Sequence, residues 1–527
     1  MQTNSPILPK KRASTPKYVS PTQLTLCGFE TPFEQSLTSN NRWVHLSKII
    51  PWDKIVIKYD MQFKSAEGRP PISGRVVIGA VIIKHILHLT DRETILQIQE
   101  NVFMQYFLGY SSFTNDAPFS PSLFVEIRER LSLDVMNGIN DIIVANSFEK
   151  SIEKTQEDSH RKDDTDSNSD TATGTEQQKA TASTEVLNTP TTSETSTEQL
   201  PLPKNAGKLL MDATVAPQNI TYPTDLKLLN ASRIKSEELI DKLYNKLIHG
   251  DVKVRTYRQE ARKEFLNTAK KKSKSAKEIY KANGTQLRYL KRNLAHIVLL
   301  QKAYEEKAIK VPLKERAIEY LEIIKLVYEQ QYTMYTERVK KIADRIVNIH
   351  QRYVRPIVRG KEGKKVEFGS KLQVSMVKGF AFIDKLSWDN FNEGQYLMDS
   401  VEKYKTRMGY YPAEVLADQI YCNRENRKKL KELNIRLMAK PLGRPKKEAL
   451  QNHLSPGERN PIEGKFGQAK VGYGLANISA KLKTTSESWI ATIFLVLNLV
   501  NLTRLNLLWV YQYFIAVLAE KKLKLSY

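Results

Sequence analysis

Residues 151–205 contain almost no large apolar side chains, and this stretch divides the chain into two parts that must fold separately. Its sequence, "SIEKTQEDSHRKDDTDSNSDTATGTEQQKATASTEVLNTPTTSETSTEQLPLPKN", is rich in Ser, Thr, Asp and Glu. Such a composition cannot bury enough apolar surface to offset the conformational entropy lost on folding. We therefore expect a disordered acidic linker over residues 151–205, with folded domains on both sides of it.

The composition of the whole chain indicates a globular protein with a polyanionic partner. The chain has 527 residues, of which 41% are hydrophobic and 27% charged, so two or three domains are expected. It carries 82 Lys and Arg against 58 Asp and Glu, a formal net charge of +24, which favours nucleic acid as the partner. Two cysteines, Cys27 and Cys422, exclude a disulfide scaffold and a cysteine zinc site, and they fit a reducing cytoplasm.

The part before the linker is predicted to be helical. Residues 1–45 are irregular and contain no secretory signal. Residues 46–150 have apolar side chains at three-to-four spacing, as in "SGRVVIGAVIIKHILHL", and Thr90 with Glu93 forms a capping-box start. We expect a compact all-α N-terminal domain over residues 46–150, acting in DNA binding or dimerisation.

One stretch near the C-terminus resembles a membrane span. Residues 489–519 are largely apolar, but Asn498, Asn501, Arg504 and Asn506 interrupt them. The longest uninterrupted apolar run is too short to cross a bilayer, and central Asn and Arg would add to the cost. A buried core helix is therefore expected, with no membrane partner.

The part after the linker, residues 206–527, reads as an α/β domain. Short apolar runs at 208–215 and 413–422 are typical of buried strands, and each carries one carboxylate, Asp212 and Asp418. Carboxylates at neighbouring strand ends would repel unless a divalent cation lay between them, and their oxygens suit Mg²⁺. Residues 236–350 are predicted to be helical and basic. This segment is longer than the connection that such a sheet needs between two strands.

A third carboxylate, Glu463, lies in "RNPIEGKFGQAK". Arg459 is four residues before it and Lys470 seven after it, so all three project from one face of a helix. A surface ladder of salt bridges gives the same pattern and remains open. For the second carboxylate, Asp384 and Asp389 in "FIDKLSWDNFNEG" are alternatives to Asp418, which we prefer because strand, carboxylate, polar turn and helix follow in succession there.

The order Asp212, Asp418, Glu463 resembles the catalytic carboxylates of DDE transposases from bacterial insertion sequences. Arg459, Glu463 and Lys470 match the spacing of the family signature Y-(2)-R-(3)-E-(6)-K, although Pro456 stands at the Tyr position. The stretches "GRPPISGRVVIGAVIIKHILHL" and "PFSPSLFVEIRERL" are similar to the N-terminal domain of such transposases.

The resemblance implies an RNase H-like catalytic domain over residues 206–527, with residues 236–350 as a helical insertion. It also implies two Mg²⁺ ions, for which Mn²⁺ can substitute, held by Asp212, Asp418 and Glu463. These ions would serve DNA cleavage and strand transfer. The implied partners are double-stranded DNA, namely the element's terminal inverted repeats and the target, and a second copy of the chain. The implied location is the bacterial cytoplasm, at the nucleoid.

Basic side chains near the carboxylates are the expected DNA contacts. Arg459 and Lys470 are expected at phosphates near the scissile bond, and the loop "AKPLGRPKKEA" offers Arg444, Lys446 and Lys447. The alternative function is a catalytically inactive, transposase-derived DNA-binding protein, because the signature Tyr is missing.

Overall fold

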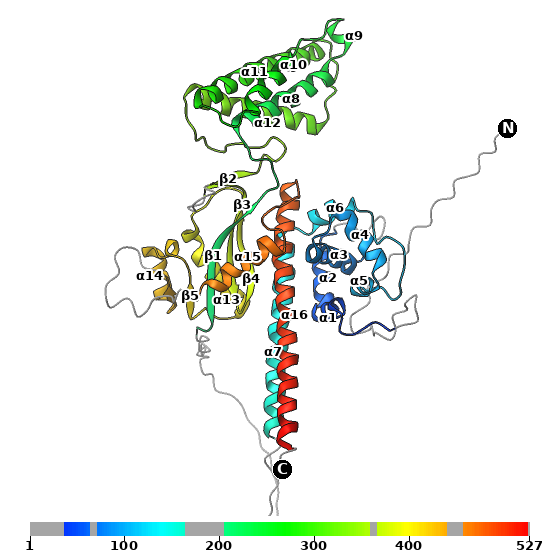
Figure 1. The fold of residues 1–527 in the computed structure, drawn as a ribbon, viewed down its shortest axis with the longest axis vertical. Coiled ribbons are helices and arrows are strands. Elements are labelled where there is room, and N and C mark those ends of the chain that lie inside the picture. The colour runs from blue at the N-terminus through cyan, green and yellow to red at the C-terminus, as the bar shows by residue number, and fades with distance from the viewer. Residues whose placement is uncertain (1–35, 64–70, 164–204, 359–365, 440–456, 525–527) are drawn as a thin grey trace, which may run out of the picture.

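A computed structural model describes residues 36–63, 71–163, 205–358, 366–439 and 457–524, with backbone alone over 150–163 and 506–524. These residues form an N-terminal group of helices, a mixed sheet with its own helices, and a separate helical lobe (Figure 1). Of the linker predicted over residues 151–205, residues 164–204 lie outside the described residues. Residues 151–163 are instead the last turns of a long helix, which ends at Asp163.

The N-terminal group is all-α, as predicted. Its central helix, α3, is buried along nearly its whole length, which explains why its sequence is apolar on every side. The capping box at the start of α4 is confirmed: the Glu93 amide donates to Thr90 Oγ1, and the Thr90 amide donates to Glu93. The helices are α1 Arg42–Ile49, α2 Trp52–Asp60, α3 Gly74–Leu87, α4 Asp91–Glu100, α5 Val102–Phe107, α6 Leu123–Arg130 and α7 Leu133–Asp163.

The sheet has six strands in the order β2-β3-β1-β5-β6, and β4 also pairs with β3. The strands are β1 Lys208–Pro217, β2 Arg355–Val358, β3 Val366–Val377, β4 Phe380–Ser387, β5 Glu414–Leu416 and β6 Arg436–Met438. β3 runs antiparallel to β1, β2 and β4, whereas β1, β5 and β6 are parallel to one another. Asp212 was expected at the end of its strand, but β1 continues to Pro217, because Ala213–Pro217 pair with β3 up to Gly369.

The helices of this part are α13 Leu397–Met408, α14 Arg424–Glu432, α15 Asn460–Gly467 and α16 Lys483–Lys524. α16 contacts β4 and lies beside α7, so it joins the sheet to the N-terminal helices (Figure 1). Its segment Lys483–Leu505 is long and apolar enough to cross a membrane, but 67% of its most apolar window is buried inside the protein. The helix is therefore a core element, as the sequence predicts, and does not indicate a membrane protein.

Between β1 and β2 the chain leaves the sheet to form the helical lobe, residues 225–336 (Figure 1). Its helices are α8 Asp225–Leu243, α9 Lys246–His249, α10 Arg258–Ala269, α11 Ala276–Glu306 and α12 Glu315–Thr336. They share a core of their own, which includes Leu239, Leu290, Ile297, Leu321 and Ile324. The lobe therefore begins nearer to β1 than residue 236, the start expected from the sequence.

Candidate active site

The pairing of β1 with β5 brings Asp212 and Asp418 to the same place. Lys208 pairs with Glu414 and Leu210 with Leu416, so the same register puts Asp212 opposite Asp418, two residues beyond the end of β5. Residues two apart on a strand point to the same face of the sheet. The two carboxylates therefore lie side by side on one face, although only one of them is at a strand end.

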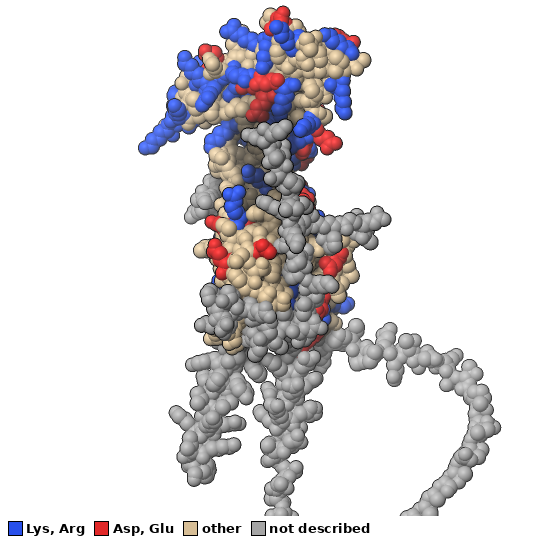
Figure 2. Space-filling view, turned by 90° about the vertical axis from the view of Figure 1, so that its right-hand side faces the viewer, with Lys and Arg blue, Asp and Glu red and all other residues tan. Residues whose placement is uncertain are grey.

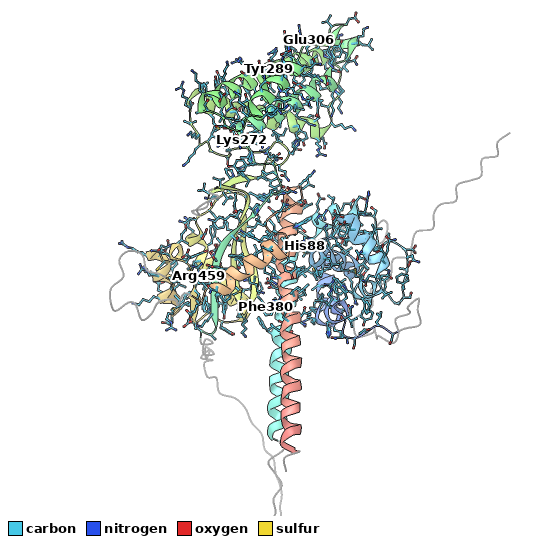
Figure 3. All side chains as sticks on the ribbon, in the orientation of Figure 1. His88, Lys272, Tyr289, Glu306, Phe380 and Arg459 are labelled. Carbon is cyan, nitrogen blue, oxygen red and sulfur yellow. The ribbon has the colours of Figure 1, made fainter. Side chains whose placement is uncertain are left out.

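Arg459 joins the pair. Its Nη2 lies 3.1 Å from Oδ2 of Asp212, and its Nη1 lies 3.3 Å from Oδ1 of Asp418. Arg459 is the N-cap residue of α15, and α15 contacts β1, so this helix places the guanidinium beside the carboxylates. Figure 3 shows Arg459 at the sheet, away from the helical lobe.

Asp212 is the more enclosed of the two carboxylates, with 19% of its side chain exposed against 57% for Asp418. Burial raises the pKa of Asp212 above its usual value, and the negative charges of Glu393 and Asp418 raise it further. The Ala213 amide, which donates to Oδ1 of Asp212, and the charge of Arg459 act in the opposite direction without cancelling the rise. The pair thus needs a positive neighbour, and Arg459 supplies one.

Glu463 lies one helical turn after Arg459 on α15, and its side chain is exposed. The structure does not bring it into contact with the pair: among the described residues no group of three His, Cys, Asp or Glu side chains has a metal-binding arrangement. Lys470 lies in the π-helical turn, residues 468–472, that follows α15. Arg444, Lys446 and Lys447 lie outside the described residues.

The alternative second carboxylates lie in other ion pairs. Asp384, on β4, contacts Arg407 Nη1 at 3.2 Å, and only 2% of its side chain is exposed. Asp389 is 3.6 Å from Arg355 Nε. Neither ion pair includes Arg459, which distinguishes both residues from Asp418.

Sequence reasoning did not identify Glu393 as a neighbour of Asp212. It lies in a short 3₁₀ turn after β4, and its carboxylate is 2.8 Å from Lys371 Nζ. Beside it, the buried Tyr421 hydroxyl donates to Gln373 Oε1 at 3.0 Å, and burial raises the pKa of that hydroxyl well above its usual value. No periodic pattern or motif marks Glu393, so the sequence carries no signal that would have found it.

Two protein families match the chain. The family described as Transposase domain (DUF772) matches residues 31–130, and the family described as Transposase DDE domain matches residues 415–500. Asp418 and Glu463 fall inside the second match, whereas Asp212 precedes it. The first match covers the helices from α1 to α6.

One curated relative is an uncharacterized protein, ORF8 in the nfe locus, from Rhizobium meliloti. It is 28% identical over 102 residues, which are 19% of this chain and 47% of the relative, so the match spans about half of the relative's length. No solved structure matches the chain. The DUF772 match and the DDE match in one chain, together with this relative, support a DDE transposase of an insertion sequence.

Proposed function

We propose that the protein binds the ends of its insertion sequence, cleaves phosphodiester bonds there and transfers the freed strand to target DNA. The observation that carries this proposal is the contact of one guanidinium with both Asp212 and Asp418, which the β1–β5 register holds on one face of the sheet. Two adjacent carboxylates that need a cation are the chemistry on which metal-assisted phosphoryl transfer depends.

The sheet supports an RNase H-like fold for this part. The path β4-β3-β1-β5-β6 has three antiparallel strands followed by two that are parallel to β1. α13 precedes β5, α14 links β5 to β6, and α15 follows β6. In this reading the helical lobe is an insertion after the first strand, and β2 is a short addition at the far end of β3. The catalytic domain would then extend over residues 206–527.

The residues present fit a divalent ion. Arg459 already places one positive group between the two carboxylates, so a cation is accommodated at that position. Asp and Glu oxygens suit Mg²⁺, and Mn²⁺ would bind the same set. Asp212, Asp418 and Glu463 would hold the ions. When bound, the ions supply activation of the attacking oxygen and stabilisation of the leaving one.

The protein's own groups would orient the DNA. Glu463 has to turn toward the pair, and its place one turn after Arg459 on α15 puts it on the same side of that helix. Arg459 would move from the carboxylates to a phosphate, and Lys470 would contact a second one. Water would attack first and free a 3′-OH, which would then attack the target. Arg444, Lys446 and Lys447 would extend this contact.

The helical lobe supports a DNA partner. Residues 252–292 carry 14 Lys or Arg and three Asp or Glu. Lys and Arg are frequent on the lobe surface in Figure 2. Contacts of Lys and Arg with phosphates do not depend on the DNA sequence, and they hold a protein in place on the duplex. Reading of the terminal inverted repeats would fall to the N-terminal domain. Acting on two ends implies a homodimer on DNA, in the cytoplasm at the nucleoid.

A cleavage assay tests the proposal. The substrate is a supercoiled plasmid carrying the DNA that flanks the gene, with Mg²⁺, with Mn²⁺ or with neither. The wild type should cut at the element ends only with a divalent ion. Asp212→Asn, Asp418→Asn and Glu463→Gln should each lose cutting while still binding DNA.

Asp389→Asn is the matched control, because this exposed carboxylate lies apart from the Asp212–Asp418 pair and should leave cutting intact. Normal cutting by the Asp418 variant would show that the second carboxylate is wrongly assigned. DNA binding by a wild-type protein that never cuts would identify an inactive, transposase-derived DNA-binding protein.

A further inference from the structure

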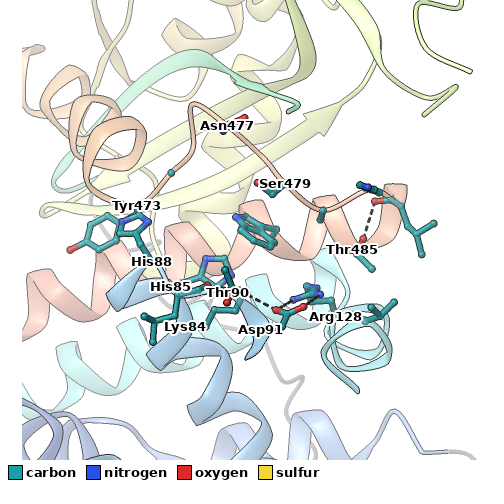
Figure 4. Close-up of a pocket in the computed structure, with 17 residues that line it drawn as sticks. Lys84, His85, His88, Thr90, Asp91, Arg128, Tyr473, Asn477, Ser479 and Thr485 are labelled. Atoms are coloured by element: carbon teal, nitrogen blue, oxygen red, sulfur yellow. Dashed lines mark hydrogen bonds and ion pairs between the residues drawn. The ribbon is translucent and has the colours of Figure 1, made fainter. Parts of the chain in front are cut away.

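A cavity of about 630 Å³ lies where the N-terminal helices meet the segment that follows α15 (Figure 4). One side is formed by residues from the end of α3 to α6, including Lys84, Thr90 and Arg128. The other side is formed by residues 473–489, including Lys481 and Trp489. Both of the regions that match transposase families therefore contribute walls to one cavity.

The walls carry an excess of positive charge. Lys84, Arg128 and Lys481 line the cavity together with one carboxylate, Asp91. Asp91 accepts two hydrogen bonds of 2.8 Å from Arg128, and Lys84 Nζ is 3.0 Å away (Figure 4). Arg128 is 6% exposed, and its buried Nε has no hydrogen-bond partner among the described residues. One carboxylate does not balance three cations, so the cavity favours an anion.

Uncharged donors and ring faces complete the lining. Thr90, Asn477, Ser479 and Thr485 offer hydroxyl or amide groups, the side chains that commonly bind DNA phosphates and sugars.

His88 stacks on Tyr473 with the ring centroids 5.9 Å apart, and its φ of 56° is rare for a residue other than glycine. This left-handed conformation ends α3, because His88 is the C-cap residue of that helix.

The cavity is tied to the strand that carries Asp212. The Ile478 amide donates to the Pro217 carbonyl, and the Asn219 amide donates to the Ile478 carbonyl, both at 2.9 Å. Gln218 lies six residues after Asp212 along the chain. At about 3.3 Å per residue this is a separation of roughly 20 Å along the strand. A duplex that runs along β1 over this length would hold about six base pairs at 3.4 Å each.

We propose that this cavity binds a sugar–phosphate segment of the DNA strand. The segment lies about six base pairs from the phosphodiester bond that is cut at Asp212 and Asp418. The phosphate lies beside Lys481, and the ring faces of Trp489 and Tyr473 flank the sugar. This inference rests on the proposed function, because it assumes that the DNA bound at the carboxylate pair also reaches the cavity. Since both regions line the cavity, the bound strand also fixes the N-terminal domain against the catalytic domain.

The test replaces one phosphate at a time by a neutral methylphosphonate in a duplex that carries the element end. For the wild type, neutralising the phosphate at one position, about six base pairs from the cut, should weaken binding several-fold. Lys481→Ala should weaken binding similarly and lower the slope of log K against log salt by about 0.9. In Lys481→Ala the same methylphosphonate should have no further effect, because the two changes remove one contact.

Lys483→Ala is the matched control, since Lys483 is exposed, lies two residues away and is not part of the cavity lining. Ser479→Phe, which fills the cavity from an exposed position, should act as Lys481→Ala does. Additive effects of Lys481→Ala and the methylphosphonate at every position would overturn the proposal, even if the wild type cuts the ends. Coupling at one position in a protein that does not cut would support the cavity and contradict only the proposed catalysis.

Discussion

At the scale of single residues, the candidate site depends on how Arg459 shares the two carboxylates. Its guanidinium contacts Asp212 at 3.1 Å and Asp418 at 3.3 Å, so it balances one of their two negative charges. The pKa of Asp212 is raised by burial and by its acidic neighbours, which means that the ionised pair is held at a cost. A divalent ion and Arg459 would therefore compete for the same oxygens.

We expect Arg459→Ala to bind Mn²⁺ more tightly than the wild type when no DNA is present. An ion pair with partly exposed carboxylates contributes up to about 1 kcal/mol, so removing the competing charge should lower the Mn²⁺ dissociation constant by up to about fivefold. Calorimetric titration measures this directly. Arg427→Ala, an exposed arginine on α14, is the control and should leave the constant unchanged. Equal or weaker binding by the Arg459 variant would show that the guanidinium does not compete.

Of the site, the sequence predicts the carboxylates and the basic residues but not how they combine. Asp212 and Asp418 stand out because a charge within a short apolar run needs a partner. Their juxtaposition depends on the parallel register of β1 and β5, which joins residues about two hundred positions apart and leaves no local pattern. Arg459 was expected at DNA, and its ion pairs with both carboxylates arise from the packing of α15 on β1. The charge of Glu393 near Asp212 is likewise a result of tertiary structure alone.

At the scale of elements, α16 explains why polar residues interrupt an apolar stretch. Asn498 is fully buried, and its amide donates to the Ala381 carbonyl at 2.8 Å and to Asn140 Oδ1 at 2.9 Å. Its Oδ1 accepts from the Ala381 amide at 2.9 Å. One side chain thus satisfies β4 backbone groups and links three elements, α7, α16 and β4.

Asn498→Ala should destabilise the protein by about 1–3 kcal/mol, because the buried Ala381 amide loses its acceptor. Thermal unfolding followed by circular dichroism should show a midpoint lower by several degrees. Asn501→Ala, three residues further along the same helix and only partly buried, is the control. If both variants unfold at the wild-type temperature, the Asn498 network does not hold α16 in place.

The sequence predicts the elements better than their ends. The capping box of α4 was readable because its two residues are three apart, and their side chains interact within one helical turn. β1 runs five residues past Asp212 because β3 pairs with it. The helical lobe was predicted as helical and basic, but its start near β1 follows from tertiary packing. Boundaries depend on such long-range contacts, which local patterns do not carry.

At the scale of the whole molecule, the N-terminal helices are joined to the rest of the protein by ion pairs and by an aromatic contact. Arg407 on α13 binds Asp141 of α7 at 3.0 Å and Asp384 of β4 at 3.2 Å. On α3, the His85 ring meets Trp489 of α16 edge-on, with the centroids 4.9 Å apart. These contacts explain why the two regions that match separate families form one body.

Docking of the N-terminal helices should weaken on mild acidification. Burial lowers the pKa of His85 well below its usual value, and the positive charges of Lys84, Arg128 and His88 lower it further, against a smaller opposite effect of Asp91. The folded protein therefore keeps His85 neutral, while the unfolded chain binds a proton below about pH 6.5. Since the unfolded state then binds more protons, stability falls as the pH drops below that value.

Thermal midpoints measured from pH 7.5 to pH 5 should decline for the wild type. They should decline less for His85→Phe, which keeps a ring against Trp489 and removes the titrating group. His249→Gln in the helical lobe is the control and should follow the wild type. Parallel curves for the His85 variant and the wild type would assign the pH dependence to other groups.

The positive charge of the molecule is concentrated in the helical lobe, and this distribution has a measurable consequence for DNA binding. Replacing Lys270, Lys272, Lys277 and Lys281 by Gln should weaken binding to any duplex by the same factor, because phosphate contacts carry no sequence information. The slope of log K against log salt should fall by up to about 3.6 if all four lysines contact phosphates. The control replaces Lys246, Lys302 and Lys325, which lie in the same lobe but are paired with carboxylates. An unchanged slope in the four-lysine variant would place the duplex elsewhere on the molecule, whereas loss of binding to element ends alone would mean that the lobe reads sequence.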